Sequence, residues 1–203
     1  MEGEKRYNIN TYFDMIYVIN LERRPDRKEK IISRLKNHNI ANYQIFPATD
    51  GSKTDMYQYY LRYKGFTDSP GAFGILSSAA RLIHDAVKSK HQRILILEDD
   101  AVFHKDFDNQ FNNRIAKIPQ DWKLLYFGTS MRRHRISEIS QHHRKREYLT
   151  SKGTIAGAFA VAIDASVFPD LLMDLNVTNK PWDLGPLRTI NMLYNSKCIV
   201  MYP

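Results

Sequence analysis

Three consecutive carboxylates, Glu98, Asp99 and Asp100, follow directly on the aliphatic run of residues 94–97. Carboxylates this close together repel one another, so the cluster is costly unless a cation or hydrogen-bond donors offset the charge. Two carboxylates on one side of the chain can bind a hard divalent cation through oxygen, and Mg²⁺ or Mn²⁺ held in this way often carries a diphosphate as well. By itself the triplet therefore indicates a metal site. The alternative is a solvated turn whose acids cap a helix.

The position of the triplet favours the metal site. Residues 93–97 have the composition of a buried strand, and ligands of open α/β sheets bind at the carboxyl ends of the strands. If the strand geometry continues through the triplet, Glu98 and Asp100 lie on one side of the chain and Asp99 lies on the other.

An arginine cluster occupies a comparable position. Arg23, Arg24 and Arg27 follow the apolar run of residues 15–21, and guanidinium groups make bidentate contacts with phosphate and ribose oxygens. A metal-bound diphosphate needs charges of both signs, so arginines at the same edge of a sheet as the acids would complement them. The alternative is an ordinary solvated helix start, because Pro25 suits the first turn of a helix.

A third polar residue follows the next predicted strand. Asp50 lies in the sequence PATDG after residues 43–46, where a carboxylate could accept a hydrogen bond from a base N–H or a ribose hydroxyl. An Asp-Gly turn also forms without any ligand, so the position fits either a turn or a binding residue.

The elements that must position these residues alternate along the chain. Patterns typical of buried strands cover residues 15–21, 43–46, 93–97, 123–127, 154–163 and 198–202. Helical patterns begin at Pro25 and cover residues 54–64, 72–90, 107–118 and 165–175. This alternation predicts an α/β fold with a mostly parallel sheet flanked by helices.

Length and composition set the outer limits. A chain of 203 residues fits a single domain, 1–203, in which we expect an N-terminal extension at 1–13 and a basic, flexible loop at 131–150. No apolar run approaches the roughly 18 residues of a membrane span, and the polar N-terminus predicts no signal peptide. The single cysteine, Cys198, excludes an internal disulfide and favours a reducing, cytoplasmic location.

The net charge of +8 raises the question of nucleic-acid binding. Residues 132–147 carry six Arg or Lys against two Glu, so this one segment holds +4 of the total. It has no interleaved aromatic residues and no nucleic-acid-binding motif, which disfavours nucleic acid as a partner. The segment is either a solvated surface loop or a loop that steers or closes over an anionic ligand.

Taken in order, six stretches resemble the motifs of glycosyltransferase family 25: VINLERRPDR, PATDG, GAFGILSS, ILILEDDAVF, LLYFG and GTIAGAFAVAI. That family includes lipooligosaccharide galactosyltransferases and procollagen galactosyltransferases. The resemblance implies a GT-A-type, Rossmann-like fold and an inverting transfer of galactose or glucose from UDP-galactose or UDP-glucose. The implied acceptor is a hydroxyl of a glycan or of a collagen-like protein, and the implied cofactor is Mn²⁺, or Mg²⁺ in its place.

The resemblance also implies roles for individual residues. The acidic triplet takes the place of the DxD motif of GT-A enzymes, with Asp100 as the direct metal ligand and Glu98 as the second metal-binding residue. Glu98 or Asp99 would reach metal-bound water or the ribose. The nucleotide-sugar-binding residues implied in this way are Asn20, Arg23, Arg24, Arg27, Asp50, Glu98 and Asp99.

An inverting transfer needs a base that takes the proton from the attacking hydroxyl. The family has an acid late in the chain in a P-x-D stretch, and residues 181–183 match it. We therefore expect Asp183 to be the base and Trp182 to form a stacking surface for a sugar. The alternative is a loop tryptophan packed on the core beside an aspartate that belongs to a turn or cap.

Two departures from the family pattern stand out. Ser78 occupies a position where the family usually has a histidine, and the chain stops at MYP where family members continue. Both departures motivate an alternative function, a catalytically silent GT-A domain that binds a nucleotide sugar or a protein partner.

Overall fold

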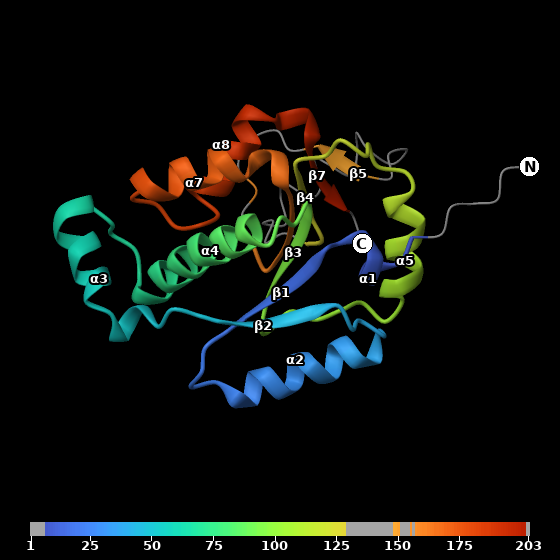
Figure 1. Ribbon diagram of the computed structural model, residues 1–203, viewed down its shortest axis with the longest axis horizontal. Helices are drawn as coiled ribbons and strands as arrows, with labels where there is room; N and C mark the ends of the chain where they lie inside the picture. The colour runs from blue at the N-terminus through green and yellow to red at the C-terminus, as the bar shows by residue number, and fades with distance from the viewer. Residues whose placement is uncertain (1–6, 129–147, 151–154, 156, 202–203) are drawn as a thin grey trace, which may run out of the picture.

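The computed structural model describes residues 7–128, 148–150, 155 and 157–201. Within these residues a seven-stranded sheet lies between two layers of helices (Figure 1). The strand order is β2-β1-β3-β6-β4-β7-β5. The strands are β1 (Met15–Asn20), β2 (Tyr43–Pro47), β3 (Arg93–Glu98), β4 (Leu124–Tyr126), β5 (Tyr148–Thr150), β6 (Ala160–Asp164) and β7 (Cys198–Met201).

The strands of this sheet run mostly in one direction. β1 is parallel to β2 and β3, and β4 is parallel to β7. β6 is antiparallel to both β3 and β4, and β5 is antiparallel to β7. The carboxyl ends of β1, β2, β3, β4 and β7 therefore meet at one side of the sheet, which we call the carboxyl edge.

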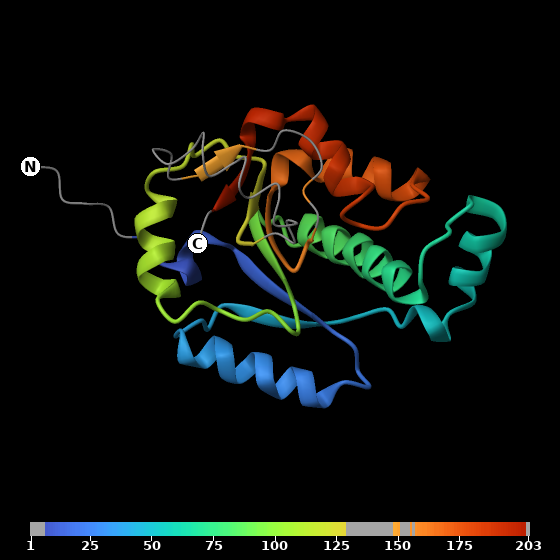
Figure 2. The same ribbon diagram turned by 180° about the vertical axis from the view of Figure 1, so that it is seen from behind.

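Helices cover both faces of the sheet (Figures 1 and 2). One buried cluster joins the sheet to α1, α2 and α5, and a second joins it to α4, α7 and α8. The helices are α1 (Ile9–Tyr12), α2 (Pro25–Asn37), α3 (Asp55–Tyr59), α4 (Pro70–Lys88), α5 (Phe107–Ile115), α7 (Phe168–Val177) and α8 (Pro186–Leu193). No helix within the described residues is both long and apolar enough to cross a membrane.

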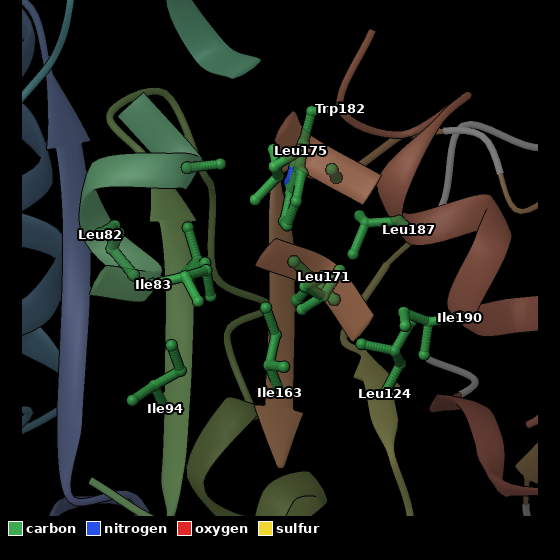
Figure 3. Packing of buried hydrophobic residues seen from close by; sticks show 14 of the residues in the cluster. Leu82, Ile83, Ile94, Leu124, Ile163, Leu171, Leu175, Trp182, Leu187 and Ile190 are labelled. Carbon is green, nitrogen blue, oxygen red and sulfur yellow. The ribbon is translucent and has the colours of Figure 1, made fainter. Parts of the chain in front are cut away.

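The two longest helices follow from their sequences. α2 begins at Pro25, where a proline has no intrahelical N–H to lose, and it buries Ile31 and Leu35 against the sheet. α4 begins after Ser69, whose side chain accepts a hydrogen bond from the Ala72 N–H. Figure 3 shows buried side chains of α4 on the same side of the sheet as those of β3, β6 and α7. The sheet is thus held rigidly from both faces.

The α/β architecture with flanking helices is confirmed, and the predicted strands and helices are present with shifted bounds. The main difference is at 154–163, where β6 begins only at Ala160 and runs antiparallel to its neighbours. Gly157 lies just before it with φ +91°, a left-handed conformation that interrupts a strand. α1, α8 and β5 were not expected, and residues 131–147 of the basic loop lie outside the described residues.

The segment taken as an N-terminal extension contributes to the core from residue 9 onward. Ile9 and Phe13 are buried, at 6% and 1% exposure. Asn10 also accepts hydrogen bonds from the backbone N–H groups of Ala41 and Asn42, which ties α1 to the chain entering β2. α1 is therefore an integral element of the domain.

Candidate functional site

The predicted site residues of β1, β2 and β3 converge at the carboxyl edge. Asn20 pairs with Pro47 in the register of β1 and β2, and Ile19 pairs with Glu98 in the register of β1 and β3. The three loops that leave these strands are therefore adjacent, although up to 79 residues separate their hydrogen-bonded partners. Parallel strands bring such distant residues together because they all end at the same edge.

Asp99 lies at the centre of this edge and is nearly inaccessible. Its side chain is 9% exposed, and each carboxylate oxygen accepts a hydrogen bond. Asn20 Nδ2 donates to Oδ2 at 2.7 Å, and Arg27 Nη1 donates to Oδ1 at 3.0 Å. Asp99 therefore ties the end of β1 and the start of α2 to the loop after β3.

Asp100 shares the same arginine but faces solvent. Arg27 Nη1 also donates to Asp100 Oδ2 at 3.1 Å, while the Asp100 side chain is 53% exposed. Two turns further along α2, Arg34 Nη1 donates to the carbonyl oxygens of Asp100 and Ala101 at 3.3 and 2.9 Å. Two arginines of one helix thus fix the backbone and one carboxylate of the acidic loop. Arg34 was missed in the sequence, where its spacing of seven residues from Arg27, two helical turns, is the signal.

The strand geometry does not continue through the acidic triplet. β3 ends at Glu98, and the Ala101 N–H donates to the Glu98 carbonyl at 3.1 Å, which closes a turn. The alternation used to place Glu98 and Asp100 on one side therefore stops at Glu98. The turn directs Asp99 to Asn20 and Arg27, and Arg27 holds Asp100 as well.

Glu98 has the most perturbed carboxylate of the site. Its pKa is raised to about 7, first by burial and then by the neighbouring charges of Asp100, Asp99 and Asp183, against a smaller lowering by Arg27. Within the described residues its carboxylate has no hydrogen-bond partner. A partly buried acid surrounded by other acids is a position where a divalent cation would relieve the repulsion.

The donor set fits such a cation only in part. Glu98 and Asp100 supply hard oxygen ligands, which suit Mg²⁺ and Mn²⁺. Among the described residues no three His, Cys, Asp or Glu side chains are close enough together to hold an ion by themselves. A cation here would therefore complete its coordination with water or phosphate oxygens, as Mg²⁺ sites on carboxylates commonly do.

Asp50 and Arg23 form a second polar group beside the first. Arg23 Nε donates to Asp50 Oδ2 at 2.7 Å, and Ser52 Oγ donates to Asp50 Oδ1 at 2.6 Å. The Ser52 hydrogen bond, followed by that of Arg23, lowers the pKa of Asp50 to about 2. A cavity of about 260 Å³ adjoins them, between the ends of β1 and β2 and the start of α4. The Asp50 turn is thus formed without a ligand, yet its carboxylate borders a cavity.

Arg24 belongs to an ordinary helix start, which was the alternative interpretation of the arginine cluster. Its Nε and Nη2 atoms donate to the two oxygens of Asp26 at 2.8 and 2.7 Å, and the Asp26 side chain is exposed while that of Arg24 is partly exposed. This pair forms at the start of α2, where an acid suits the helix dipole. Of the three arginines, Arg27 contacts the acidic triplet, Arg23 contacts Asp50, and Arg24 contacts neither.

Two glycines that the sequence reasoning missed bring the Asp50 loop against α4. A Cβ on Gly51 would lie 1.9 Å from the Pro70 carbonyl oxygen, and a Cβ on Gly74 would lie 2.6 Å from that of Thr49. Ser78, fully buried, accepts a hydrogen bond from the Thr49 N–H at 2.8 Å and donates to the Gly74 carbonyl. Close backbone contact therefore fixes Asp50, and Ser78 is part of that contact.

Asp183 reaches the carboxyl edge from the face of the sheet that α4, α7 and α8 cover, opposite the face that carries α2. Its Oδ2 accepts a hydrogen bond from the Gly157 N–H at 3.2 Å, and it lies close enough to Glu98 to raise the pKa of that acid. The neighbouring Trp182 is only 3% exposed and packs with Leu175 in the core (Figure 3). The expectation that Trp182 offers a stacking surface for a sugar is wrong, because its ring is covered by the α4–α7–α8 layer.

Comparison with known proteins adds a family and a fold. Residues 13–156 match the family model described as glycosyltransferase family 25 (LPS biosynthesis protein). Procollagen galactosyltransferase 1 of Danio rerio is 29% identical over 130 residues, which are 57% of this chain and 21% of that protein. The inactive glycosyltransferase 25 family member 3 of Homo sapiens is 28% identical over 134 residues, 57% of this chain and 22% of that protein. The matches thus span only about a fifth of these relatives.

A solved structure gives the fold. A mannosyltransferase from Pyrobaculum calidifontis, in complex with GDP-Man and Mn²⁺, superposes with a TM-score of 0.51 at 11% identity, covering 100% of this chain and 58% of that chain. At this identity the likeness shows the fold alone. It confirms a GT-A-type α/β architecture.

Proposed function

The chain belongs to glycosyltransferase family 25, and from this premise we propose that it is an inverting, metal-dependent hexosyltransferase. Its donor is a UDP-sugar, UDP-galactose or UDP-glucose, and its acceptor is a hydroxyl of a glycan or a collagen-like protein. The observation that carries the proposal is one edge of the sheet at which the acids Glu98 and Asp100 lie beside Arg27. A metal-bound diphosphate needs this combination of charges.

The donor side of the site is formed by the loops after β1 and β2. Arg23 is 52% exposed and can turn one guanidinium edge to phosphate or ribose oxygens while it remains paired with Asp50. The cavity of about 260 Å³ beside Asp50 would receive part of the nucleoside. Asn20 and Asp99 support this side of the site indirectly. Asn20 is hydrogen-bonded to Asp99, and Asp99 in turn holds Arg27 in place.

Glu98 and Asp100 would hold Mn²⁺ or Mg²⁺. When bound, such a cation offsets the negative charge that grows on the departing diphosphate. Support for a divalent cation comes from the raised pKa of Glu98 and from the absence of a partner for its carboxylate among the described residues. The mannosyltransferase with the same fold was solved with Mn²⁺.

Asp183 is the proposed base. The Gly157 N–H holds Oδ2, and within the described residues Oδ1 has no hydrogen bond. Asp183 takes the proton of the acceptor hydroxyl while that oxygen bonds to the anomeric carbon and the bond from this carbon to the diphosphate oxygen breaks. Attack from the side opposite the leaving group gives the inverted product.

A catalytically silent domain that binds a nucleotide sugar or a protein partner is the second candidate. It is supported by the relative named as inactive and by Ser78, which stands where the family usually has a histidine. Ser78 is fully buried and hydrogen-bonded within the Thr49–Gly74 contact, so its role in this chain is to pack α4 against the Asp50 loop.

Donor hydrolysis separates the two candidates. The protein is incubated with Mn²⁺ and either UDP-galactose or UDP-glucose, and free hexose and UDP are quantified. An enzyme releases both products slowly without an acceptor, whereas a silent domain binds UDP with Mn²⁺ but releases no hexose. Absence of any UDP binding in the presence of Mn²⁺ would refute the transferase and the nucleotide-sugar-binding form of the silent domain, and would leave the domain that binds a protein partner.

Variants then assign the roles. Asp183→Asn should bind UDP with Mn²⁺ normally and lose transfer by about 10²-fold or more, the usual contribution of a general base. Asp100→Ala should lose the metal-dependent part of UDP binding. The control is Asp121→Asn, which removes an exposed ion pair with Lys197 just before β4, at the opposite edge of the sheet, and should change neither property.

A reducing compartment is part of the proposal. It is supported by the single cysteine, Cys198, which is fully buried and whose thiol pKa is raised by burial, so the chain has neither a disulfide partner nor a reactive thiolate at this position.

A further inference from the structure

An aromatic cavity adjoins the acidic loop on the face covered by α5. It has a volume of about 530 Å³ and lies between α5 and residues of the strands β3, β6 and β7, with Phe127 just after β4. Four phenylalanines that are neither fully buried nor fully exposed line it: Phe103, Phe107, Phe127 and Phe159. A cavity of this size can hold a ring-sized group, and partly exposed phenylalanines gain free energy when such a group covers them.

The walls of this cavity are preformed by ring packing. Phe103 and Phe107 meet edge to face with centroids 5.0 Å apart, and Phe107 lies 6.3 Å from Phe127. Phe111, which is buried, stacks on Phe127 at 6.1 Å and 15°. Rings held by several neighbours lose little conformational freedom when a ligand binds.

The cavity is continuous with the candidate site. Glu98 and Asp100 contribute to its lining, so a group bound between the phenylalanines would place its attached polar atoms at the acidic loop. Arg114 and His104 line it as well, so its charged side chains are not of one sign, and its lining is mostly apolar. The occupant that fits is therefore a neutral, apolar group joined to a polar one.

The position of the cavity also separates it from the donor side. The Arg23–Asp50 group lies at β1 and β2, whereas the aromatic cavity lies toward β6 and β4, with the acidic loop of β3 between them. In an inverting transfer the attacking hydroxyl and the leaving diphosphate lie on opposite sides of the anomeric carbon, and their alignment decides the rate. The cavity is on the side from which the acceptor must come.

We propose that this cavity, which we call the phenylalanine pocket, binds an apolar, aryl-sized group of the acceptor next to its reacting hydroxyl. The inference rests on the proposed transferase function and narrows its acceptor to glycosides or other hydroxyl compounds that carry such a group. The phenylalanine pocket determines acceptor affinity, and the hydroxyl joined to the bound group lies at the carboxyl edge, where Asp183 is close to Glu98.

Two acceptors that differ only in the aglycone provide the test. Phenyl β-galactoside and methyl β-galactoside, and the same pair of glucosides, are titrated by calorimetry into protein that holds UDP and Mn²⁺, and are also assayed for transfer. The phenyl compound should bind about tenfold tighter or more, as expected for burial of one ring. Calorimetry measures acceptor binding without any transfer, so the comparison of phenyl and methyl compounds does not require the sugar that the enzyme uses as its acceptor.

Three variants test whether this preference arises in the phenylalanine pocket. Ala160→Leu fills the pocket from its floor on β6 and should abolish the preference for the phenyl compound without weakening UDP binding. Phe103→Ala removes one half-exposed wall and should reduce the preference severalfold. Ala116→Leu, the same change at the exposed end of α5, should leave it intact.

Three results would overturn the inference. Equal binding of the phenyl and methyl compounds excludes an aryl subsite. A preference that survives both Ala160→Leu and Phe103→Ala places the subsite elsewhere. If the phenyl compound binds protein without UDP but not protein that holds UDP, the two compete and the pocket belongs to the donor. In each of these cases the protein can still bind UDP and hydrolyse the donor, so the proposed function stands. If the proposed function itself is wrong, UDP binding and donor hydrolysis are absent.

Discussion

Asp99 and Asp100 are adjacent in the sequence but have different surroundings. Asp99 is buried with both oxygens hydrogen-bonded, and Asp100 is half exposed with one contact to Arg27. The carboxylate of Asp99 is closed to solvent, whereas that of Asp100 is open to it. In the proposed function Asp99 therefore acts on the donor through Arg27 and Asn20, and Asp100 would bind a cation directly.

The difference between these two acids predicts unequal effects on stability. Asp99→Asn should lower the free energy of unfolding by about 1–2 kcal/mol, because it leaves the Arg27 guanidinium without its buried counterion. Asp100→Asn should cost less than about 0.5 kcal/mol, since an exposed pair contributes little and one repulsive charge near Glu98 is removed. Urea denaturation without ligands measures both. Equal losses would contradict the distinction.

Glu98 predicts a pH dependence of stability. Its pKa is raised from 4.5 to about 7, first by burial and then by Asp100, Asp99 and Asp183. Between these pH values the unfolded chain has released this proton and the folded protein has not, so the free energy of unfolding falls as pH rises through the window. Glu98→Gln should remove this fall and be more stable than wild type by about 1–3 kcal/mol at pH 8, with no such gain at pH 4.

Denaturation curves from pH 4 to pH 8, recorded with a metal chelator present, test this expectation. Glu29→Gln, the same change at an exposed position of α2, is the control and should follow the wild-type curve. A Glu98→Gln curve parallel to the wild-type curve would show that Glu98 does not titrate in this window.

At the residue scale the sequence predicted which side chains meet but not how they meet. The strand-end positions of Asn20, Asp50 and Glu98 brought the acids and arginines to one edge. The pairing of Asp99 with Asn20 depends on a reversal of the chain after Glu98 that no periodicity encodes. The turn of Arg24 toward Asp26 is a local contact at the start of α2. Trp182 was misplaced because a tryptophan in a loop sequence packs on a core as readily as it lines a site.

At the element scale the Asp50 loop depends on two glycines of different elements. A methyl group on Gly51 or Gly74 would overlap backbone oxygens of Pro70 or Thr49. Backbone atoms cannot rotate away as a side chain can. Gly51→Ala and Gly74→Ala should therefore each lower the free energy of unfolding by about 2 kcal/mol or more and weaken donor binding by displacing Asp50.

The first turn of α4 provides a matched control for these glycines. Gly71 is exposed, and a Cβ on it would meet only the Ser69 hydroxyl oxygen at 3.7 Å. Gly71→Ala should be neutral or stabilising by up to about 1 kcal/mol, since alanine favours the helix. Chemical denaturation and UDP titration of the three variants test the set. Equal effects of all three would show that the close backbone contact does not hold the loop.

Elements with a strong pattern of apolar residues were predictable from the sequence, whereas features that depend on packing against neighbouring elements were not. α2 and α4 have apolar residues at helical spacing, and β1 and β3 are continuous apolar runs. The direction of β6 was not predictable, because antiparallel and parallel buried strands have the same apolar pattern. α8 spans eight residues, and its burial depends on packing against α7.

At the scale of the whole molecule the candidate site connects parts of the sheet that are far apart in sequence. The loops after β1, β2 and β3 meet there, and Asp183 reaches the same edge from the layer formed by α4, α7 and α8. A ligand bound across these loops would stabilise the folded chain as a whole, because it has no comparable site in the unfolded chain.

This arrangement predicts that UDP and Mn²⁺ stabilise the protein cooperatively. Each alone meets an uncompensated charge, since Glu98, Asp99 and Asp100 repel the diphosphate and the arginines repel the cation. When UDP and Mn²⁺ bind together, their charges neutralise each other, and they occupy both the arginine side and the acidic side of the carboxyl edge. At about 100 times the dissociation constant, binding contributes about 2.7 kcal/mol, which for a chain of this size corresponds to an increase in Tm of roughly 5–10 °C.

Thermal unfolding with UDP alone, Mn²⁺ alone and both ligands measures this cooperativity. We expect the increase in Tm with both ligands to exceed the sum of the separate increases, and we expect Asp100→Ala to make the two effects additive. Asp121→Asn, at the opposite edge, should retain the wild-type behaviour. Additive increases in the wild-type protein would mean that UDP and Mn²⁺ bind at independent places, and the acidic loop would then not be a joint metal–diphosphate site.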